Sequence, residues 1–516
     1  MRIGIDVGGT NTDAVLVTAE NQVLTTTKTS TTQDVTSGIT TAIAALRAQA
    51  GFDPADIQAV MIGTTHFVNA LVEAKRLAPT AVIRFGLPAT SGLPPLVAWP
   101  RRLTEAIAGR GYLCHGGHEF DGRTISPLDR DEVLAAAADA VAGGTRSIAI
   151  SSVFSPVNAD FELQAAELIA AEYPDLFISL SHEIGRVGLL ERENATVINA
   201  CLRQVAEQVC TALTEALRLA DISAPLFLSQ NDGTLMDIDF TRRYPVATFA
   251  SGPTNSMRGA AFLSGVDNCV VVDVGGTTTD VGALQSGFPR EAAIEVEVAG
   301  VRTNFRMPDV LSVGIGGGSL VRGEKDVTVG PDSVGYRVTS QALVFGGDTL
   351  TATDIAVAAG HADIGDRSLV AHLSPELVRA ATERIAADIA AVVDRMRTSP
   401  TPIPVVAVGG GSILVADELE GAAKVFRPDH FAVANAIGAA IAQVGGEVDR
   451  VFPVAPGMRD EVLDQARQEA VDKAIAAGAE PGSVRIVEVD ELPLAYLPGN
   501  ATRIRVKAVG DLATIS

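Results

Sequence analysis

Two copies of one short glycine motif constrain the fold of this chain more than any other feature. The first copy is IGIDVGGTNTD (3–13) and the second is VVVDVGGTTTD (270–280). Each reads as an apolar strand ending at an Asp, a Gly-Gly-Thr turn, and a second strand. Because glycine has no Cβ, backbone N–H groups in such a turn can face anionic oxygens. One copy alone also fits a plain hairpin, but two copies predict a duplicated domain that clamps one nucleotide.

The polar residues of the two motifs suit phosphate chemistry. Asp6 and Asp273 end their strands, where a carboxylate can hold a hydrated Mg²⁺. Asp13 and Asp280 close the motifs and complete the set of candidate catalytic carboxylates. The turns supply backbone and hydroxyl groups for phosphate oxygens. The candidate nucleotide-binding residues there are Gly8, Gly9, Thr10, Asn11, Thr12, Gly275, Gly276, Thr277 and Thr278.

Two further glycine clusters follow the second motif. The apolar run 405–408 leads into Gly409, Gly410, Gly411 and Ser412, ahead of a segment that is expected to be helical. A purine and ribose could lie against this turn, although close helix packing would explain its glycines equally well. The cluster Gly316, Gly317 and Gly318 either touches the nucleotide from the opposite side or forms a tight turn.

With these motifs in order, the sequence resembles the actin, hexokinase and Hsp70 ATPase superfamily, and within it the hydantoinase A and 5-oxoprolinase family. The resemblance covers residues 1–455 in collinear order. Besides the two loops, it rests on IGTTHFVNALVE (62–73), ERENATVINACL (191–202), SQNDGTLM (229–236), SGPTNSMRGAAFLSG (251–265), VGIGGGSLVRG (313–323) and LTATDIAVAAG (350–360). It implies an α/β fold with two lobes, each a ribonuclease H-like domain. Beyond them, a charged helix expected over 460–477, followed by strands over 484–489 and 502–509, suggests a small C-terminal α+β appendix.

The resemblance also implies a reaction. The amide oxygen of a hydantoin, 5-oxoproline or related lactam would take the γ-phosphoryl group of ATP, and water would then open the ring. ATP and Mg²⁺ are the implied cofactors, with Asp6 and Asp273 organising the metal through waters. Two alternatives stay open, a nucleotide-driven conformational switch or reactivator and a small-molecule kinase. A kinase needs a carboxylate base beside the γ-phosphate, and the sequence offers no unmistakable one.

Candidate substrate residues follow the strand expected at 59–63. Thr64, Thr65, His66 and Asn69 would lie where a doubly wound sheet exposes its loops, although capping of the next helix is the alternative. Glu191, Glu193 and Asn194 begin the long helix expected over 188–219. They are either catalytic polar residues or a helix start whose carboxylates complement the dipole.

The segment from Cys114 to Glu119 has a spacing that suggests zinc, through Cys114, His115 and His118. No second ligand cluster with matching spacing lies nearby in the sequence, which favours a polar loop over a metal site. Its position within an expected insertion makes it a candidate for substrate or subunit contact.

The length of 516 residues predicts more than one domain. We expect an N-terminal lobe over 1–187 with an insertion at 76–125, a second lobe over 188–456, and the appendix over 457–516. Helices at 188–219 and 432–444 are expected to connect the lobes as a hinge.

Because the sequence departs from the family pattern at several positions, it does not identify the ring of the substrate. Asn11 stands where many relatives carry an aromatic residue, and 85–100 is rich in proline. No region like the several hundred residues of a B-type subunit is present. We therefore expect a second subunit to complete the active site. Assembly of the chain into a homo-oligomer stays an open alternative.

The composition of the chain argues against some classes of binding partner. A net charge of −22 and an aromatic content of 4% argue against nucleic acid. The four cysteines show no C-x-x-C pair, so a disulfide framework is not expected. No apolar run reaches the roughly 20 residues of a membrane span, and the N-terminus lacks the pattern of a signal peptide. The sequence therefore predicts a cytoplasmic protein that does not bind membranes.

Overall fold

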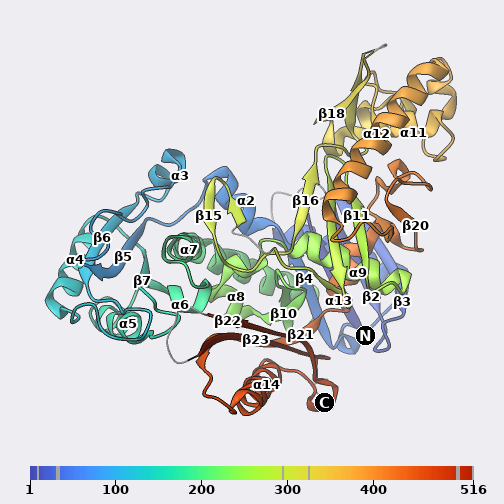
Figure 1. The fold of residues 1–516 in the computed structure, drawn as a ribbon. Coiled ribbons are helices and arrows are strands. Elements are labelled where there is room, and N and C mark those ends of the chain that lie inside the picture. Colours follow the sequence, from blue (N-terminus) through green and yellow to red (C-terminus); the bar gives the residue numbers. More distant parts are fainter. Residues whose placement is uncertain (9–10, 31–34, 293–295, 324–325, 495–499, 514–516) are drawn as a thin grey trace.

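The computed structural model describes residues 1–8, 11–30, 35–292, 296–323, 326–494 and 500–513. Two large sheets form the centres of two lobes, and a separate four-stranded sheet flanks the first lobe (Figure 1). Strands in both lobes are covered on both faces, which is why β1 and β11 read as nearly unbroken apolar runs. Among the described residues, no helix is both long and apolar enough to cross a membrane.

The two lobes repeat one strand order. In each lobe, the first strand pairs antiparallel with the second, and the second pairs antiparallel with the third. On its other side, the first strand pairs parallel with the fourth, and the fourth pairs parallel with the fifth. The predicted two-lobed duplicated fold is therefore confirmed. The strands of the first lobe are β1 (Arg2–Val7), β2 (Asn11–Val17), β3 (Val23–Ser30), β4 (Ala59–Thr64) and β9 (Leu226–Ser229); those of the second are β11 (Cys269–Val274), β12 (Thr279–Gln285), β16 (Val310–Val313), β19 (Ile403–Val408) and β20 (Ala422–Phe426).

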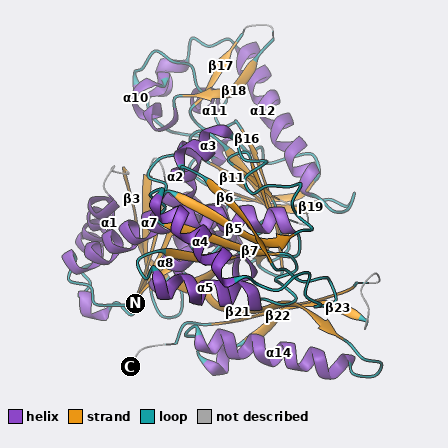
Figure 2. Cartoon of the chain, turned by 90° about the vertical axis from the view of Figure 1, so that its left-hand side faces the viewer, coloured by secondary structure: helices purple, strands orange, loops and turns teal. Residues whose placement is uncertain are grey.

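The C-terminal segment extends the sheet of the first lobe. Beyond β9 the sheet continues through β10 (Thr234–Asp237), β21 (Gln443–Pro453), β23 (Ala501–Gly510) and β22 (Arg485–Pro493). Helix α14 (Arg459–Ala476) lies beneath these strands and packs on β21 and β23 through a stripe of Leu and Ala (Figure 2). The predicted appendix is thus an α+β unit whose strands join the main sheet. The domain boundaries themselves stay a prediction.

The flanking sheet contains much of the expected insertion. It is parallel, in the order β6 (Arg110–His115), β5 (Thr80–Leu87), β7 (Ser147–Ser152) and β8 (Phe177–Leu180), with α4 (Arg130–Ala142) and α5 (Asp160–Glu172) packed against it. The segment 85–100 is therefore irregular only after β5 ends. Helix α7 (Leu189–Leu219) packs between this sheet and α1 (Val35–Ala50).

Two helices connect the lobes. The chain crosses to the second lobe through α9 (Ser251–Ser264) and returns through α13 (Ala434–Ala440), and the two helices pack together between the sheets (Figure 1). The hinge expected at 432–444 is shorter because β21 begins at Gln443. The hinge expected at 188–219 is wrong, because α7 stays with the flanking sheet and α9 makes the crossing instead.

The remaining helices and strands belong to the two lobes and to the region around the flanking sheet. They include α2 (His66–Glu73), α3 (Arg101–Ala106), α6 (Ser181–Ile184), α8 (Ile238–Arg243), β13 (Phe288–Pro289), β14 (Val296–Val298), β15 (Val301–Thr303), β17 (Ser319–Arg322), β18 (Thr328–Ser333), α10 (Val338–Gln341), α11 (Ala352–Ala358) and α12 (Pro375–Met396).

The crossing of α9 and α13 depends on glycine. A Cβ on Gly259 would overlap the carbonyl oxygen of Ala434, and a Cβ on Gly438 would overlap that of Asn255. We therefore expect Gly259→Ala to lower the free energy of unfolding by about 1–3 kcal/mol, the usual cost of overpacking. Gly252 on the same helix is the matched control, since its nearest neighbour to an added Cβ is 4.0 Å away. Gly252→Ala should leave stability unchanged or raise it.

Urea unfolding of the two variants measures the difference. Equal changes in the free energy of unfolding for both would contradict the view that backbone approach at Gly259 sets the crossing.

Candidate nucleotide site and a second pocket

The four predicted carboxylates occupy equivalent positions in the two lobes. Asp6 lies opposite Asp13 across the first hairpin, and Asp273 lies opposite Asp280 across the second. Asp6 and Asp13 are buried, whereas Asp273 and Asp280 are half-buried. The duplication seen in the sequence is therefore also a duplication of carboxylate placement.

These carboxylates lie close enough together to interact electrostatically. Burial, followed by the charges of Asp13 and Asp273, raises the pKa of Asp6 to about 7. Burial likewise raises the pKa of Asp273 to about 6. Lys28 is an ion-pair partner within this group, with its Nζ 2.7 Å from Asp13 Oδ1. A group of crowded carboxylates with raised pKa values is an environment that a divalent cation would relieve.

Side chains from the two crossing helices hold both aspartates. Ser256 Oγ on α9 donates to Asp273 Oδ2 at 2.5 Å, and Asn435 Nδ2 on α13 donates to Asp6 Oδ2 at 2.8 Å. Asn255, the neighbour of Ser256, is fully buried, yet neither of its amide atoms has a hydrogen-bond partner within the described part of the chain. Such an orphaned amide calls for a partner.

The space beside Asn255 is shared with Asp6. A Cβ on Gly63 would lie 2.5 Å from Asn255 Nδ2 and 2.6 Å from Asp6 Oδ1, so both side chains pack against this glycine and a larger residue would displace them. The donor set of one amide and one carboxylate fits a water of a hydrated Mg²⁺.

Sequence reasoning missed Asn255, Ser256 and Asn435. The signal available was a pair of polar residues at 255–256 within a helix of small residues.

The two glycine turns have the same internal bond. Gly8 N donates to Asn11 O at 3.0 Å, and Gly275 N donates to Thr278 O at 2.9 Å. Gly275, Gly276, Thr277 and Thr278 are exposed, as a phosphate loop requires, and Thr12 is buried. Gly9 and Thr10, also predicted to bind phosphate, lie outside the described residues.

Both later glycine clusters pack against the second turn. Gly317 N and Gly318 N donate to Gly275 O at 3.0 Å and Gly276 O at 2.8 Å, so these amides support the loop from behind. Gly316 lies against the backbone of the same loop.

The cluster at 409–412 approaches the second turn from the other side. Gly411 N donates to Val274 O at 2.8 Å, and a Cβ on Gly409 would overlap the carboxylate of Asp273. Gly410 has open space around it. Ser412 is buried and begins a single 3₁₀ turn, which replaces the longer helix expected there. A nucleoside role for this cluster stays a prediction.

The predicted substrate residues divide into two groups. Thr64 pairs with Val7 in the parallel register of β1 and β4, beside the first turn, and its Oγ1 lies 2.6 Å from His66 Nδ1. Burial lowers the pKa of His66. Asn69 instead donates to Thr65 Oγ1 at 3.2 Å, within the first turn of α2. Their roles toward a substrate stay predictions.

The start of α7 makes structural contacts. Glu193 receives Arg84 Nε at 2.6 Å and Ser151 Oγ at 2.6 Å, deep between α7 and the flanking sheet. Asn194 receives Trp99 Nε1 at 2.8 Å. These partners satisfy both side chains and favour a structural role over a catalytic one.

The residues with zinc-like spacing point in different directions. Cys114 is buried in the core of the flanking sheet, His115 lies 3.2 Å from Glu132, and His118 stacks on Phe161. In the described ranges, no group of three or more His, Cys, Asp or Glu side chains could hold a metal ion.

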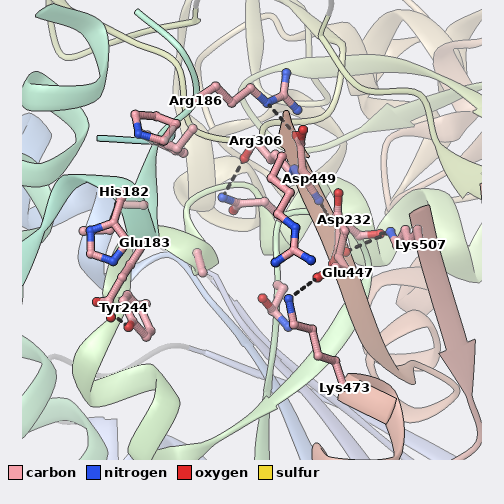
Figure 3. Close-up of a pocket in the computed structure, with 18 of the residues that line it drawn as sticks. His182, Glu183, Arg186, Asp232, Tyr244, Arg306, Glu447, Asp449, Lys473 and Lys507 are labelled. Atoms are coloured by element: carbon pink, nitrogen blue, oxygen red, sulfur yellow. Dashed lines mark hydrogen bonds and ion pairs between the residues drawn. The ribbon is translucent and has the colours of Figure 1, made fainter. Parts of the chain in front are cut away.

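A cavity lies away from both turns. It has a volume of about 760 Å³ and opens between α6, α8, the turn after β9, and strands β21 and β23 (Figure 3). Its lining includes none of the predicted nucleotide or substrate residues. Sequence reasoning did not predict it, because its walls come from segments separated by some 300 residues.

The duplicated lobes and paired turns define the actin, hexokinase and Hsp70 class of two-lobed folds. Profiles for the hydantoinase/oxoprolinase N-terminal region and for hydantoinase/oxoprolinase match residues 2–173 and 192–364. The chain therefore belongs to the hydantoinase/oxoprolinase family.

Related proteins agree with this placement. The chain is 28% identical over 392 residues to the caprolactamase subunit alpha of Pseudomonas jessenii, covering 70% of this chain and 54% of that protein. It is 25% identical over 402 residues to the acetone carboxylase beta subunit of Xanthobacter autotrophicus, covering 70% of this chain and 54% of that protein. The chain thus spans about half the length of these curated relatives.

Solved structures show the same fold. The ATP-dependent caprolactamase from Pseudomonas jessenii superposes with a TM-score of 0.80 at 20% identity, covering 99% of this chain and 88% of that chain. Nucleotide-free acetone carboxylase superposes with a TM-score of 0.69 at 18% identity, covering 100% and 88%.

The crowding of carboxylates predicts a stability effect. Asp6 has a higher pKa in the folded than in the unfolded chain, so it binds more protons when folded between about pH 4 and pH 7. The free energy of unfolding contributed by this group therefore falls as the pH rises through that window. We expect Asp6→Asn to raise the free energy of unfolding at pH 8 by about 1 kcal/mol or more, and to flatten the pH dependence.

Urea unfolding at pH 5 and pH 8, with a chelator present, measures both effects. Glu420→Gln, which removes one exposed carboxylate from the second lobe, serves as the control and should change little. An Asp6→Asn protein less stable than the wild type at pH 8 would show that the carboxylate is stabilising.

Proposed function

We propose that this chain is the ATP-dependent component of a cyclic amide hydrolase. The observation that carries the proposal is the pairing of Asp6 and Asp273 at equivalent strand ends, each bonded by a crossing helix between the lobes. This arrangement supports one nucleotide held by both lobes. The family membership supports a cyclic amide as the molecule that is activated.

The chemistry follows from the stability of an amide. Resonance makes the carbonyl carbon a poor electrophile, so water attacks it slowly. In the proposed reaction the amide oxygen attacks the γ-phosphorus and ADP leaves. Water then adds to the activated carbon, and the ring C–N bond breaks as the nitrogen takes a proton, which leaves an acyl phosphate. A second water hydrolyses the acyl phosphate and releases phosphate, so one lactam, one ATP and two waters give the ring-opened acid, ADP and phosphate.

The protein contributes position and charge neutralisation, which dominate phosphoryl transfer. Asp6 and Asp273 would hold a hydrated Mg²⁺, and Asn255 would bind one of its waters. The two turns would hold the phosphates, with Gly409–Ser412 beside the nucleoside. Magnesium, when bound, would offset the negative charge of the phosphates and of the crowded carboxylates.

A second subunit is part of the proposal. The related caprolactamase and carboxylase chains are named as alpha, beta and gamma subunits. In the described part of this chain, Thr64 and His66 lie beside the first turn, but no carboxylate there is clearly placed to activate water. We infer that a partner polypeptide supplies that group, and that the pair acts in the cytoplasm.

Product analysis tests the proposal. The purified chain is assayed with Mg²⁺-ATP and caprolactam, hydantoin or 5-oxoproline, alone and after co-expression with the products of neighbouring genes. We expect little ring opening by the chain alone and a ring-opened acid with ADP and phosphate from the co-expressed complex. Asp273→Ala should abolish this product, while Glu418→Ala, at an exposed carboxylate of the same lobe, should not.

Each other product contradicts part of the proposal. ADP and phosphate without ring opening would indicate a conformational switch, and a stable phosphorylated product would indicate a kinase. Rapid ring opening by the single chain would remove the need for a partner.

A further inference from the structure

The cavity of about 760 Å³ is a second candidate ligand site, and none of the predicted nucleotide-binding residues lines it. Its volume falls within the roughly 300–1,000 Å³ of small-molecule pockets. Figure 3 shows charged side chains from α6, β21, β23 and α14 directed toward one space. We refer to it as the β21 pocket.

One wall of the β21 pocket is apolar and open to solvent. Val157, Val187 and Phe240 line it, and their side chains are 38%, 46% and 43% exposed. The Phe240 ring lies 4.5 Å from that of Tyr244, between centroids. Large apolar side chains gathered at the mouth of a cavity favour a ligand with a hydrocarbon part.

The lining of the pocket is also rich in cations. Six Lys and Arg residues line the pocket against four Asp and Glu residues, in a chain whose net charge is −22. The cations are Arg186, Arg306, Arg450, Lys473, Arg503 and Lys507; the anions are Glu183, Asp232, Glu447 and Asp449. Local excess of positive charge on an acidic protein marks a site for an anion.

One carboxylate of this lining is shared among three guanidinium groups. Asp449 Oδ2 lies 2.6 Å from Arg503, 3.0 Å from Arg306 and 4.0 Å from Arg186. The Nε of Arg186 is buried and has no hydrogen-bond partner among the described residues. Burial, followed by the charge of Arg505, lowers the pKa of Arg306 to about 10. Arg186 and Arg306 also pair with Glu291 and Glu447, so the Nε of Arg186 is the donor in this group that lacks an acceptor among the described residues.

We infer that the β21 pocket binds a small organic carboxylate, with the carboxylate beside Arg186 and Arg306 and the hydrocarbon chain against Phe240 and Val187. The planar fork of a guanidinium matches a carboxylate in two hydrogen bonds. Opening a lactam produces such an acid, so the site would suit the product of the proposed reaction. The binding itself does not require ATP hydrolysis and can be tested without it.

Calorimetric titration tests the inference with defined probes. Hexanoate and 6-aminohexanoate should bind at millimolar concentration or below. Hexanamide and hexylamine, which keep the chain but lack the carboxylate, should not bind. Inorganic phosphate, which lacks the chain, should not compete. Absence of binding by both carboxylates, or equal binding of hexanamide or phosphate, would overturn the inference.

Matched variants locate the binding. Phe240→Ala should weaken hexanoate binding about tenfold, whereas Phe262→Ala, at a side chain of equal exposure (42%) on α9, should not. Arg186→Gln should also weaken it about tenfold, and Arg290→Gln, at another half-buried arginine paired with a carboxylate, should not. Equal losses in variants and controls would place the ligand elsewhere.

The surface variant Phe240→Ala decides the matter if Arg186→Gln fails to fold. Response to Mg²⁺-ATP should persist in Phe240→Ala. A protein that binds hexanoate but not the nucleotide would count against the proposed function and leave the β21 pocket intact.

Discussion

The close crossing of α9 and α13 is the contact on which the rest of this structure depends. Because Gly259 and Gly438 have no side chain, the backbones of the two helices pack in direct contact between the lobes. Consecutive residues of α9 then face different lobes. Asn255 lies near Asp6 of the first lobe, while Ser256 donates to Asp273 of the second. Asn435 of α13 donates to Asp6, so the two crossing helices together position both aspartates.

The same arrangement joins stability to function. Burying carboxylates near one another opposes folding at neutral pH, and a bound cation would reverse that effect. The β21 pocket is connected to this region by Asn231, whose Oδ1 accepts from Ala250 N at the start of α9 and whose carbonyl accepts from Thr254 Oγ1. A ligand in the pocket and a nucleotide beside the aspartates would thus act on neighbouring residues of α9.

The sequence predicted those elements that depend on interactions between nearby residues. The two loops, and the C-terminal helix followed by two strands, were visible as glycine-marked or charged segments of the sequence. The pairing of strands that are distant in the sequence could not be predicted. The tail joins the main sheet because β23 pairs with β21, with Lys507 opposite Glu447, and nothing within 457–516 shows that partner. Glu193 read equally as catalytic or structural until Arg84, 109 residues earlier, was seen to bind it. The orphaned amide of Asn255 is a property of packing alone.

The central claim is that two lobes form one nucleotide site. Calorimetric titration of the protein with a non-hydrolysable ATP analogue and Mg²⁺ tests it most directly. A single binding event is predicted, with one nucleotide per chain, and Asp6→Ala or Asp273→Ala alone should weaken that same event by about tenfold or more. Two independent binding events, or full affinity in either variant, would contradict the account.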